Sequence, residues 1–148
     1  MKIVKVRKVR NVKTPTIGTG LSAGLDFYIP EDFETKRVWP GESISILTGI
    51  RAQIPRGCAL IMFSKSGVAT KRQLRVGDCV VDEDYQGEIH LHVLNVGRKA
   101  IILKPGMELV QGLVVPALYV GVEVIESGGE LFPQPTERGQ EGFGSAGE

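Results

Sequence analysis

The stretch Val80-Val81-Asp82-Glu83-Asp84-Tyr85-Gln86-Gly87-Glu88-Ile89 brings an apolar pair, several carboxylates and an aromatic ring to a glycine turn. An alternating run, typical of a half-buried strand, leads away from Ile89. This order predicts a β-hairpin that presents an acid, Asp82, and a stacking ring, Tyr85, at its tip. Acids at hairpin tips are common, and an aspartate there can simply cap the turn. The stretch alone therefore leaves a catalytic and a structural role open.

Short apolar or alternating runs continue along the whole chain, with turn signals such as Pro40-Gly41 and Pro105-Gly106 between them. Only 68–74 could form a helical turn or two. At 148 residues, we expect one domain with a substantial core. The pattern predicts an all-β sandwich, barrel or jelly roll. The predicted strands are 3–9, 24–28, 43–47, 51–54, 58–63, 79–82, 89–94, 100–103, 108–115 and 120–124.

Composition narrows the class of function. The formal net charge is only +1, which disfavours general binding to nucleic acid. No apolar run is long enough to cross a bilayer, and the basic N-terminal stretch lacks the apolar centre of a signal peptide. The two cysteines, Cys58 and Cys79, lie in apolar contexts, where we expect reduced, buried thiols. We therefore expect a soluble intracellular protein with neither a membrane nor a nucleic-acid partner.

The two ends differ from the rest of the chain. Residues 1–13 hold six of the 18 Lys and Arg residues, alternating with Ile and Val. This pattern favours an edge strand whose charges discourage pairing with other chains, and a phosphate-binding arm is the alternative. Residues 126–148 hold six of the 19 glycines, a composition typical of a disordered terminus. Yet Arg138-Gly139 and Gly142-Phe143-Gly144-Ser145 suit an arm that closes over a phosphorylated base, because glycines let backbone amides approach phosphate oxygens.

Five motifs in order carry a resemblance to a known family. They are Ala23-Gly24-Leu25-Asp26-Phe27, Ser64-Lys65-Ser66-Gly67-Val68, the stretch around Asp82, Pro105-Gly106-Met107-Glu108-Leu109-Val110-Gln111, and Arg138-Gly139-Gln140-Glu141-Gly142-Phe143-Gly144-Ser145. Together they span nearly the whole chain, which resembles the trimeric dUTPases, the deoxyuridine 5′-triphosphate nucleotidohydrolases. The resemblance implies a jelly-roll-like β-barrel of the β-clip type, assembled as a homotrimer with sites at subunit boundaries. It also divides the chain into a barrel domain, 1–125, and an arm, 126–148, that closes over a neighbouring subunit's site.

The resemblance implies a reaction as well: hydrolysis of dUTP to dUMP and pyrophosphate. In this family the residue matching Asp82 is the base that orients and activates a water for attack on the α-phosphorus. Asp26 and Asp84 are expected in supporting positions. Mg²⁺ is expected as cofactor, held by the triphosphate and not by a direct protein cage.

The remaining matches imply contacts with the substrate. Tyr85 would pack beneath the deoxyribose and exclude a 2′-hydroxyl, although a buried core tyrosine is the alternative. Phe143 would stack on uracil, while Arg138 and Ser145 would contact the γ-phosphate. Ser66 and Gln111 match phosphate contacts but are also compatible with ordinary turn and strand hydrogen bonds. The full set of expected substrate-binding residues is Lys65, Ser66, Gly67, Cys79, Val81, Tyr85, Gln111, Arg138, Phe143, Gly144 and Ser145.

Four positions depart from the family pattern. Lys65 stands where arginine is usual, so the charge is kept but the bidentate fork is lost. Cys79 replaces a common glycine and could narrow the base pocket. Glu108 replaces an arginine, and Glu141 replaces a glycine near the expected phosphates. The carboxylates of Glu108 and Glu141 are expected to be neutralised from Lys65, Lys71, Arg72 or Arg75, so that activity survives with altered affinity.

Three other functions remain open. The dCTP deaminases share the fold, but their catalytic glutamate, ten residues after the position of Asp82, is here His92. A regulatory nucleotide-binding protein would be consistent with the departures at 65, 108 and 141. A purely structural jelly roll is disfavoured by the intact motifs. His90 and His92 share one strand face without an evident third zinc ligand, so we expect surface or interface histidines.

Overall fold

The chain folds into antiparallel β-sheets, and the computed structural model describes residues 2–77 and 79–140. In chain order, the elements in these ranges are β1 (Lys5–Lys8), β2 (Thr16–Ile17), β3 (Gly24–Tyr28), β4 (Lys36–Val38), β5 (Ser43–Leu47), β6 (Ile50–Gln53), β7 (Cys58–Ser64), α1 (Ser66–Lys71), β8 (Leu74–Val76), β9 (Val80–Val81), β10 (His90–Asn95), β11 (Ile101–Leu103) and β12 (Glu108–Pro116). The all-β prediction is confirmed.

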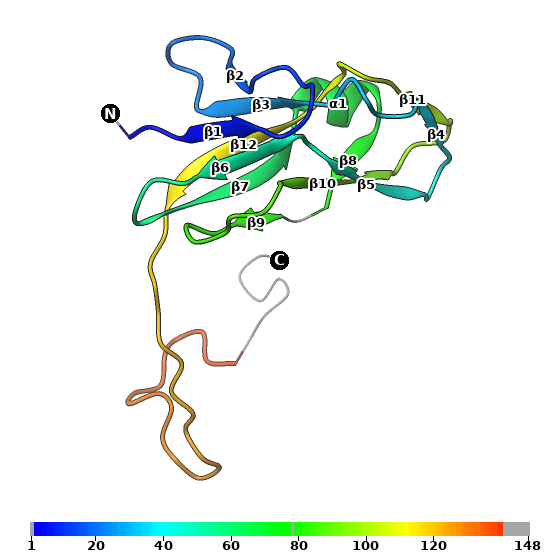
Figure 1. The fold of residues 1–148 in the computed structure, drawn as a ribbon. Helices are drawn as coiled ribbons and strands as arrows, with labels where there is room; N and C mark the ends of the chain where they lie inside the picture. Colours follow the sequence, from blue (N-terminus) through cyan, green and yellow to red (C-terminus); the bar gives the residue numbers. More distant parts are fainter. Residues whose placement is uncertain (1, 78, 141–148) are drawn as a thin grey trace.

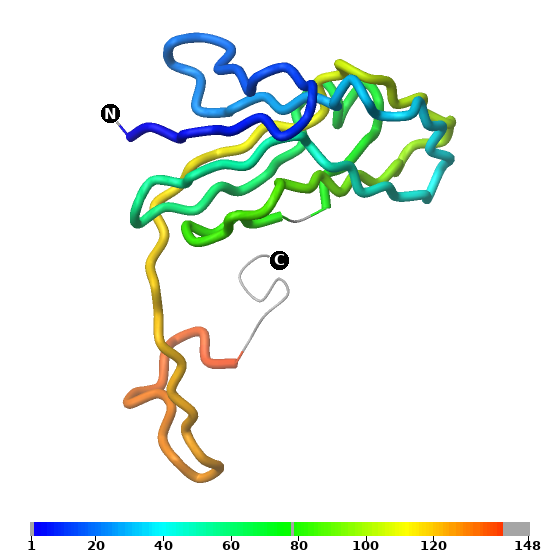
Figure 2. The backbone as a smooth tube through the Cα atoms, viewed as in Figure 1, coloured from blue at the N-terminus to red at the C-terminus, as the bar shows by residue number. Residues whose placement is uncertain are grey.

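Two sheets form the body of the molecule. The larger has the order β2-β3-β12-β7-β9, and the smaller has the order β5-β10-β8. The remaining four strands form two separate two-stranded sheets, β1-β6 and β4-β11. Figure 1 shows these strands gathered in one body, while the segment after β12 leaves it. The smooth trace in Figure 2 shows that this segment, residues 117–140, extends away from the body of strands.

The core lies where the apolar faces of these sheets meet. Phe27 and Val110 of the larger sheet belong to the same buried cluster as Leu91 and Val93 of β10. Strand β10 alternates strictly at its start, so that His90 and His92 are exposed while Leu91 is buried. The exposed histidines agree with the surface position expected for them.

Several sequence predictions are confirmed by this fold. Strands β3 and β5 have the predicted bounds, and the one described helix lies within two residues of its predicted start. The basic N-terminal stretch forms β1, an exposed strand paired only with β6, as the edge-strand interpretation expects. Cys58 and Cys79 are both free thiols, as expected, but only Cys58 is fully buried; Cys79 is half-buried.

As a separate observation, no helix among the described residues is long and apolar enough to cross a membrane.

Two predictions are wrong. The stretch around Asp82 is not a hairpin, because β9 pairs with β7 of the larger sheet while β10 pairs with β5 and β8. The loop therefore connects two sheets. The predicted strand 120–124 has no strand structure, and Val120 and Val122 are 80% and 91% exposed. Alternation alone does not make a strand when no neighbouring strand is present to satisfy its backbone groups.

Candidate functional site

The loop from Asp82 to Ile89 is held at its start by Glu83. The Glu83 carboxylate accepts a hydrogen bond from the backbone N–H of Gly57, 2.7 Å away, and another from the Tyr119 hydroxyl. These bonds, the Tyr119 bond first, hold the pKa of Glu83 below its ordinary value. The loop is thus fastened both to the turn before β7 and to the segment that follows β12.

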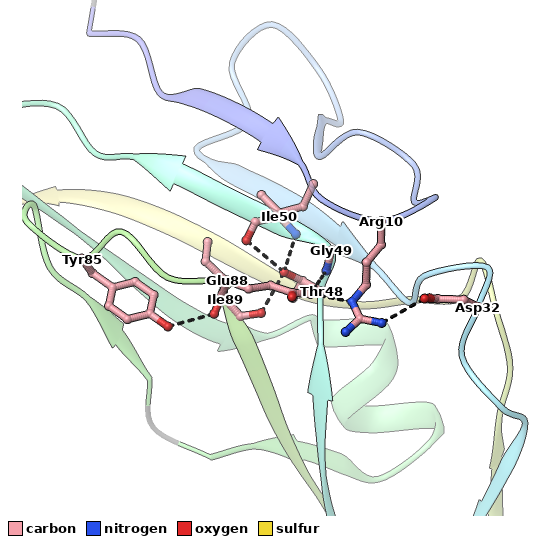
Figure 3. A network of polar contacts seen from close by, with 8 residues as sticks. All are labelled: Arg10, Asp32, Thr48, Gly49, Ile50, Tyr85, Glu88 and Ile89. Carbon is pink, nitrogen blue, oxygen red and sulfur yellow. Dashed lines mark hydrogen bonds and ion pairs between the residues drawn. The ribbon is translucent and has the colours of Figure 1, made fainter.

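A second network holds the other end of the loop (Figure 3). The Glu88 carboxylate accepts from the Gly49 N–H at 2.6 Å and from the Arg10 guanidinium at 3.1 Å. The buried Thr48 hydroxyl donates to the carbonyl oxygen of Ile89 at 2.8 Å. Tyr85 donates its hydroxyl proton to the Glu88 carbonyl oxygen at 2.9 Å. The ring of Tyr85 therefore has a fixed position on the loop.

Asp82 and Asp84, on either side of Glu83, are exposed. They line a depression of about 620 Å³ together with Arg56, Glu83 and Tyr119. Tyr85, 41% exposed, lines a neighbouring depression and is not a core tyrosine. Among the described residues, none makes a hydrogen bond or ion pair with the Asp82 side chain, whereas the neighbouring Glu83 carboxylate accepts from the distant Gly57 N–H. A carboxylate in this position is available to bind and activate a water molecule.

A second group of expected site residues lies around Lys65, which ends the connection from β7 into α1. Its ammonium group lies 2.7 Å from a carboxylate oxygen of the nearly buried Asp26 and also forms an ion pair with Glu108. Partial burial lowers the pKa of Lys65, but the hydrogen bonds to Asp26 and Glu108 outweigh it and hold the pKa above its usual value. Lys65 is therefore the cation that neutralises Glu108.

Gln111 completes this group on β12. Its partner across the sheet is Asp26, and a Cβ at Gly24 would lie only 2.7 Å from the Gln111 side-chain oxygen. Glycine is therefore required at position 24 for the amide to lie over the strand. Asp26, Lys65 and Gln111 line a pocket of about 360 Å³. Ser66 and Gly67 begin α1 beside it and are exposed.

The structure does not bring the two groups together within one chain. Asp82 follows β9, two strand positions from the β12 residue Gln111, a separation of about 10 Å across the sheet. Along the strands, Val81 lies opposite Leu60 while Gln111 lies opposite Phe63, which adds about another 10 Å. The two offsets are at right angles, so the Asp82 and Gln111 backbones of one chain lie roughly 14 Å apart, and their side chains line separate depressions.

The remaining expected site residues are spread around the loop and the C-terminal segment. Cys79 is half-buried, its thiol donates to the His90 carbonyl oxygen at 3.7 Å, and burial raises its pKa. Val81 is buried in the core. Arg138 is exposed on the segment outside the sheets. Four further expectations, Glu141, Phe143, Gly144 and Ser145, lie outside the described residues.

Sequence reasoning missed the residues that hold the loop in place. Glu83, Glu88, Arg10 and Tyr119 all make contacts with residues distant in sequence, as in the 78-residue separation between Arg10 and Glu88. The high density of acidic residues in the Asp82 loop could have pointed to Glu83 and Glu88, but it does not reveal the residues that they bind. Within the described residues, no group of three His, Cys, Asp or Glu side chains is arranged to hold a metal ion.

Comparison with known proteins places these residues in a family. The family model described as dUTPase matches residues 10–147. The chain belongs to the dUTPase family. Among relatives, it is 33% identical over 154 residues to the Desulfitobacterium hafniense deoxyuridine 5′-triphosphate nucleotidohydrolase, covering 99% of this chain and 95% of that protein.

Two mammalian members of the dUTPase family are longer than this chain. The rat nucleotidohydrolase is 32% identical over 142 residues, which cover 96% of this chain. The human mitochondrial nucleotidohydrolase is 31% identical over 147 residues, which cover 99%. The chain spans only 65% of the rat protein and 55% of the human protein.

Solved dUTPase structures share the fold. A mutant of the Staphylococcus bacteriophage 80alpha dUTPase with dUpNHpp matches with a TM-score of 0.82 and 22% identity, covering 100% of both chains. A mutant dUTPase from phage phi11 of S. aureus, whose structure describes coordination of a structural Mg(II) ion, matches with a TM-score of 0.74 and 21% identity, covering 84% of this chain and 97% of that one. The jelly-roll-like dUTPase fold is thereby confirmed.

Proposed function

We propose that this chain is a dUTP diphosphatase, which hydrolyses dUTP to dUMP and pyrophosphate, and that Asp82 is its base. The observation that carries the proposal is the exposed Asp82 carboxylate, which no described residue bonds, on a loop that Glu83 and Glu88 fasten at both ends. Family membership supplies the substrate. A rigid loop supports catalysis because a general base must be held within hydrogen-bond reach of the proton it takes.

The reaction balances with the groups at hand. Asp82 accepts a proton from water while the water oxygen forms a bond to the α-phosphorus. The bond between that phosphorus and the bridging oxygen to the β-phosphorus breaks, and pyrophosphate leaves with the electron pair. Catalysis of this kind depends on positioning and on neutralising the leaving group's charge.

Tyr85 is proposed to select the deoxyribose. Its hydroxyl is held by the Glu88 carbonyl oxygen, so the ring cannot easily rotate away from a sugar packed against it. A fixed ring leaves no space for a 2′-hydroxyl. Cys79 and Val81 are proposed to line the uracil pocket, with the half-buried Cys79 thiol, whose pKa burial raises, as a packing group.

The phosphate contacts are proposed to come from Ser66, Gly67, Gln111 and, on the arm, Arg138, Gly144 and Ser145, with Phe143 stacked on the base. Lys65 has a different role, because its charge is already matched by Asp26 and Glu108. We infer that Lys65 holds the first, second and fourth motifs together and contributes less to phosphate binding than an unpaired arginine would.

A magnesium ion fits the proposed site only if the substrate brings it. The described carboxylates of Asp82 and Asp84 are exposed, and no cluster of three possible ligands surrounds them. Mg²⁺ commonly binds through substrate phosphates and one or two carboxylates. When bound to the triphosphate, the ion would offset its negative charge beside Asp82.

We propose a homotrimer in which the two groups of site residues meet across subunit boundaries. The separation of Asp82 from Gln111 within one chain supports this arrangement. So does the exposure of Phe63, Val80 and the 117–125 segment, whose apolar side chains need a partner surface. Residues 1–125 would form the barrel and 126–148 the arm that closes over a neighbouring subunit's site. An intracellular setting, where dUTP is formed, belongs to the same proposal.

Pyrophosphate release from dUTP, dCTP, dTTP and UTP with Mg²⁺ tests the function, with Asp82→Asn as the key variant and Asp84→Asn as its matched control. We expect selective turnover of dUTP that falls by at least about a hundredfold in Asp82→Asn and much less in Asp84→Asn. Tight dUTP binding without turnover would instead support a regulatory binding protein. Deoxyuridine triphosphate formed from dCTP would support a deaminase.

Truncation after Pro135 tests the arm. Turnover should fall sharply while the trimer stays folded, because the arm contributes closure and not core. Unchanged turnover would contradict the proposed arm.

A further inference from the structure

A cavity at the far end of α1 gathers positive charge that the proposed reaction does not use. It has a volume of about 540 Å³ and lies between the end of α1, the loop after β10 and strand β11. Its lining contains no acidic side chain and five basic ones: Lys71, Arg72, Arg98, Lys99 and Lys104. The chain as a whole has a formal net charge of only +1, so this is a marked local excess.

None of these five cations forms an ion pair with a described residue; the ion pairs of Arg10 and Lys65 lie elsewhere in the fold. Five like charges around one hollow repel one another, and a neighbouring carboxylate would ordinarily relieve that repulsion. An anion with several negative charges would therefore complement the cavity electrostatically.

The cavity is built on a fixed framework. Asn95 is fully buried, and its side-chain amide donates to the carbonyl oxygens of Val38 and Lys99, each at 2.9 Å. Its side-chain oxygen accepts the Gly97 N–H at 2.9 Å. These bonds determine the conformation of the loop that carries Arg98 and Lys99.

The opposite wall is equally constrained. Gln73 has a φ of 52°, the left-handed conformation that glycine usually takes just after a helix. Its carbonyl oxygen accepts the Val96 N–H at 3.0 Å, which joins the segment after α1 to the loop after β10. Two basic segments are thus held together by backbone bonds despite their repulsion.

We propose that this cavity is a second anion site that binds an oligophosphate group, independent of the proposed reaction. The compact cluster of five cations fits a short chain of phosphates. Half-buried Ala100 and Ile101 and the exposed Ile102 supply apolar surface beside the cations. The lining offers no aromatic ring on which successive bases of a nucleic-acid strand could stack. The group could belong to a nucleotide or to free inorganic oligophosphate.

Amide NMR of the full-length protein tests the site, with inorganic tripolyphosphate as the probe. We expect shifts at Gly97, Arg98 and Lys99 that saturate. The double variant Arg98→Ala/Lys104→Ala should weaken binding about tenfold, because each exposed ion pair contributes roughly a threefold change. The matched control, Lys36→Ala/Arg75→Ala, removes one lysine and one arginine that are exposed but outside the lining, and it should bind like the wild type.

Parallel titrations with ATP and with a single-stranded oligonucleotide distinguish the sources. Tighter binding of ATP than of tripolyphosphate would assign the site to nucleotides, and equal binding would assign it to the phosphate chain alone. Three results would overturn the proposal. The shifts could be confined to residues 24, 65–67 and 111, or the cavity variant could bind tripolyphosphate as tightly as the wild type. The third is much tighter binding of the oligonucleotide than of tripolyphosphate at the cavity residues. Since activity is not the readout, failure here and failure of the proposed hydrolysis are separate results.

Discussion

The two ends of α1 use lysine and arginine in opposite ways. At its start, Lys65 lies between the carboxylates of Asp26 and Glu108. At its end, Lys71 and Arg72 face further cations and no acid across a cavity. The first arrangement joins motifs of the fold, while the second leaves charge available to a ligand. The comparison teaches that the function of a basic residue depends on its neighbours and not on its own charge.

The largest expected effect comes from the framework of the basic end. Asn95→Ala should lower the free energy of unfolding by about 3 kcal/mol, because it removes the side-chain partner of one buried and two part-buried backbone groups. Urea unfolding measures this value, with the exposed Asn11→Ala as control and an expected change within about 0.5 kcal/mol. A cost below about 1 kcal/mol for Asn95→Ala would show that the cavity wall is not held as described.

At the paired end, Lys65→Met should cost about 2 kcal/mol, a value between those of exposed and buried ion pairs. The variant leaves Asp26, 9% exposed, without its counter-charge. Glu108→Gln is the matched control and should cost less than about 1 kcal/mol, because Lys65 then keeps Asp26. Equal costs in the two variants would show that the Lys65–Asp26 pair stabilises the fold no more than the Lys65–Glu108 pair.

Relief of charge repulsion should give a smaller effect of opposite sign. Arg98→Ala/Lys104→Ala should raise Tm by about one degree at low ionic strength, and the gain should vanish in about 0.5 M NaCl because salt screens exposed charges. Thermal unfolding at both salt concentrations, beside Lys36→Ala/Arg75→Ala, provides the measurement. A fall in Tm, or a gain independent of salt, would argue against repulsion within the cavity.

The smallest expected effect concerns acid stability. The pKa of Glu83 is lowered in the folded protein, so its anchoring bonds contribute above the ordinary value of 4.5 and are lost as pH falls through the lowered pKa. Glu83→Gln should therefore show a shallower fall in Tm than the wild type from about pH 6 to about pH 3. The Glu34→Gln variant, at an exposed position, serves as control. If Tm changes with pH equally in Glu83→Gln and the wild type, the Glu83 bonds add nothing to stability.

Local patterns predicted much of the fold. Strands β3 and β5 were predicted with their observed bounds because alternation and flanking turns mark them clearly. Strands β2, β4 and β8 were missed because two or three residues are too few for a period to appear. The short helical segment predicted at 68–74 overlaps the observed α1 and starts two residues later.

The candidate site residues came from the motifs, whereas the contacts that hold them came only from the structure. The order of motifs singled out Asp82, Tyr85, Lys65 and Gln111, and family membership supports that selection. The expected hairpin was wrong because strand pairing depends on the whole sheet: β9 pairs with β7 and not with β10, the next strand in sequence. Likewise, the alternation at 120–124 correctly marks apolar side chains, but a strand forms only where another backbone can pair with it.

The amino-acid sequence by itself determined the all-β class, the family and the candidate chemistry, because these depend on local alternation and on the order of short motifs. Only the tertiary structure decided which charges are neutralised and which are left unpaired. Lys65 meets Asp26 and Glu108 through contacts that span up to 43 residues of sequence. Arg98 and Lys71 line one cavity because Asn95 holds the loop that carries Arg98. Such encounters depend on the packing of distant segments, so no periodicity or spacing along the chain reveals them.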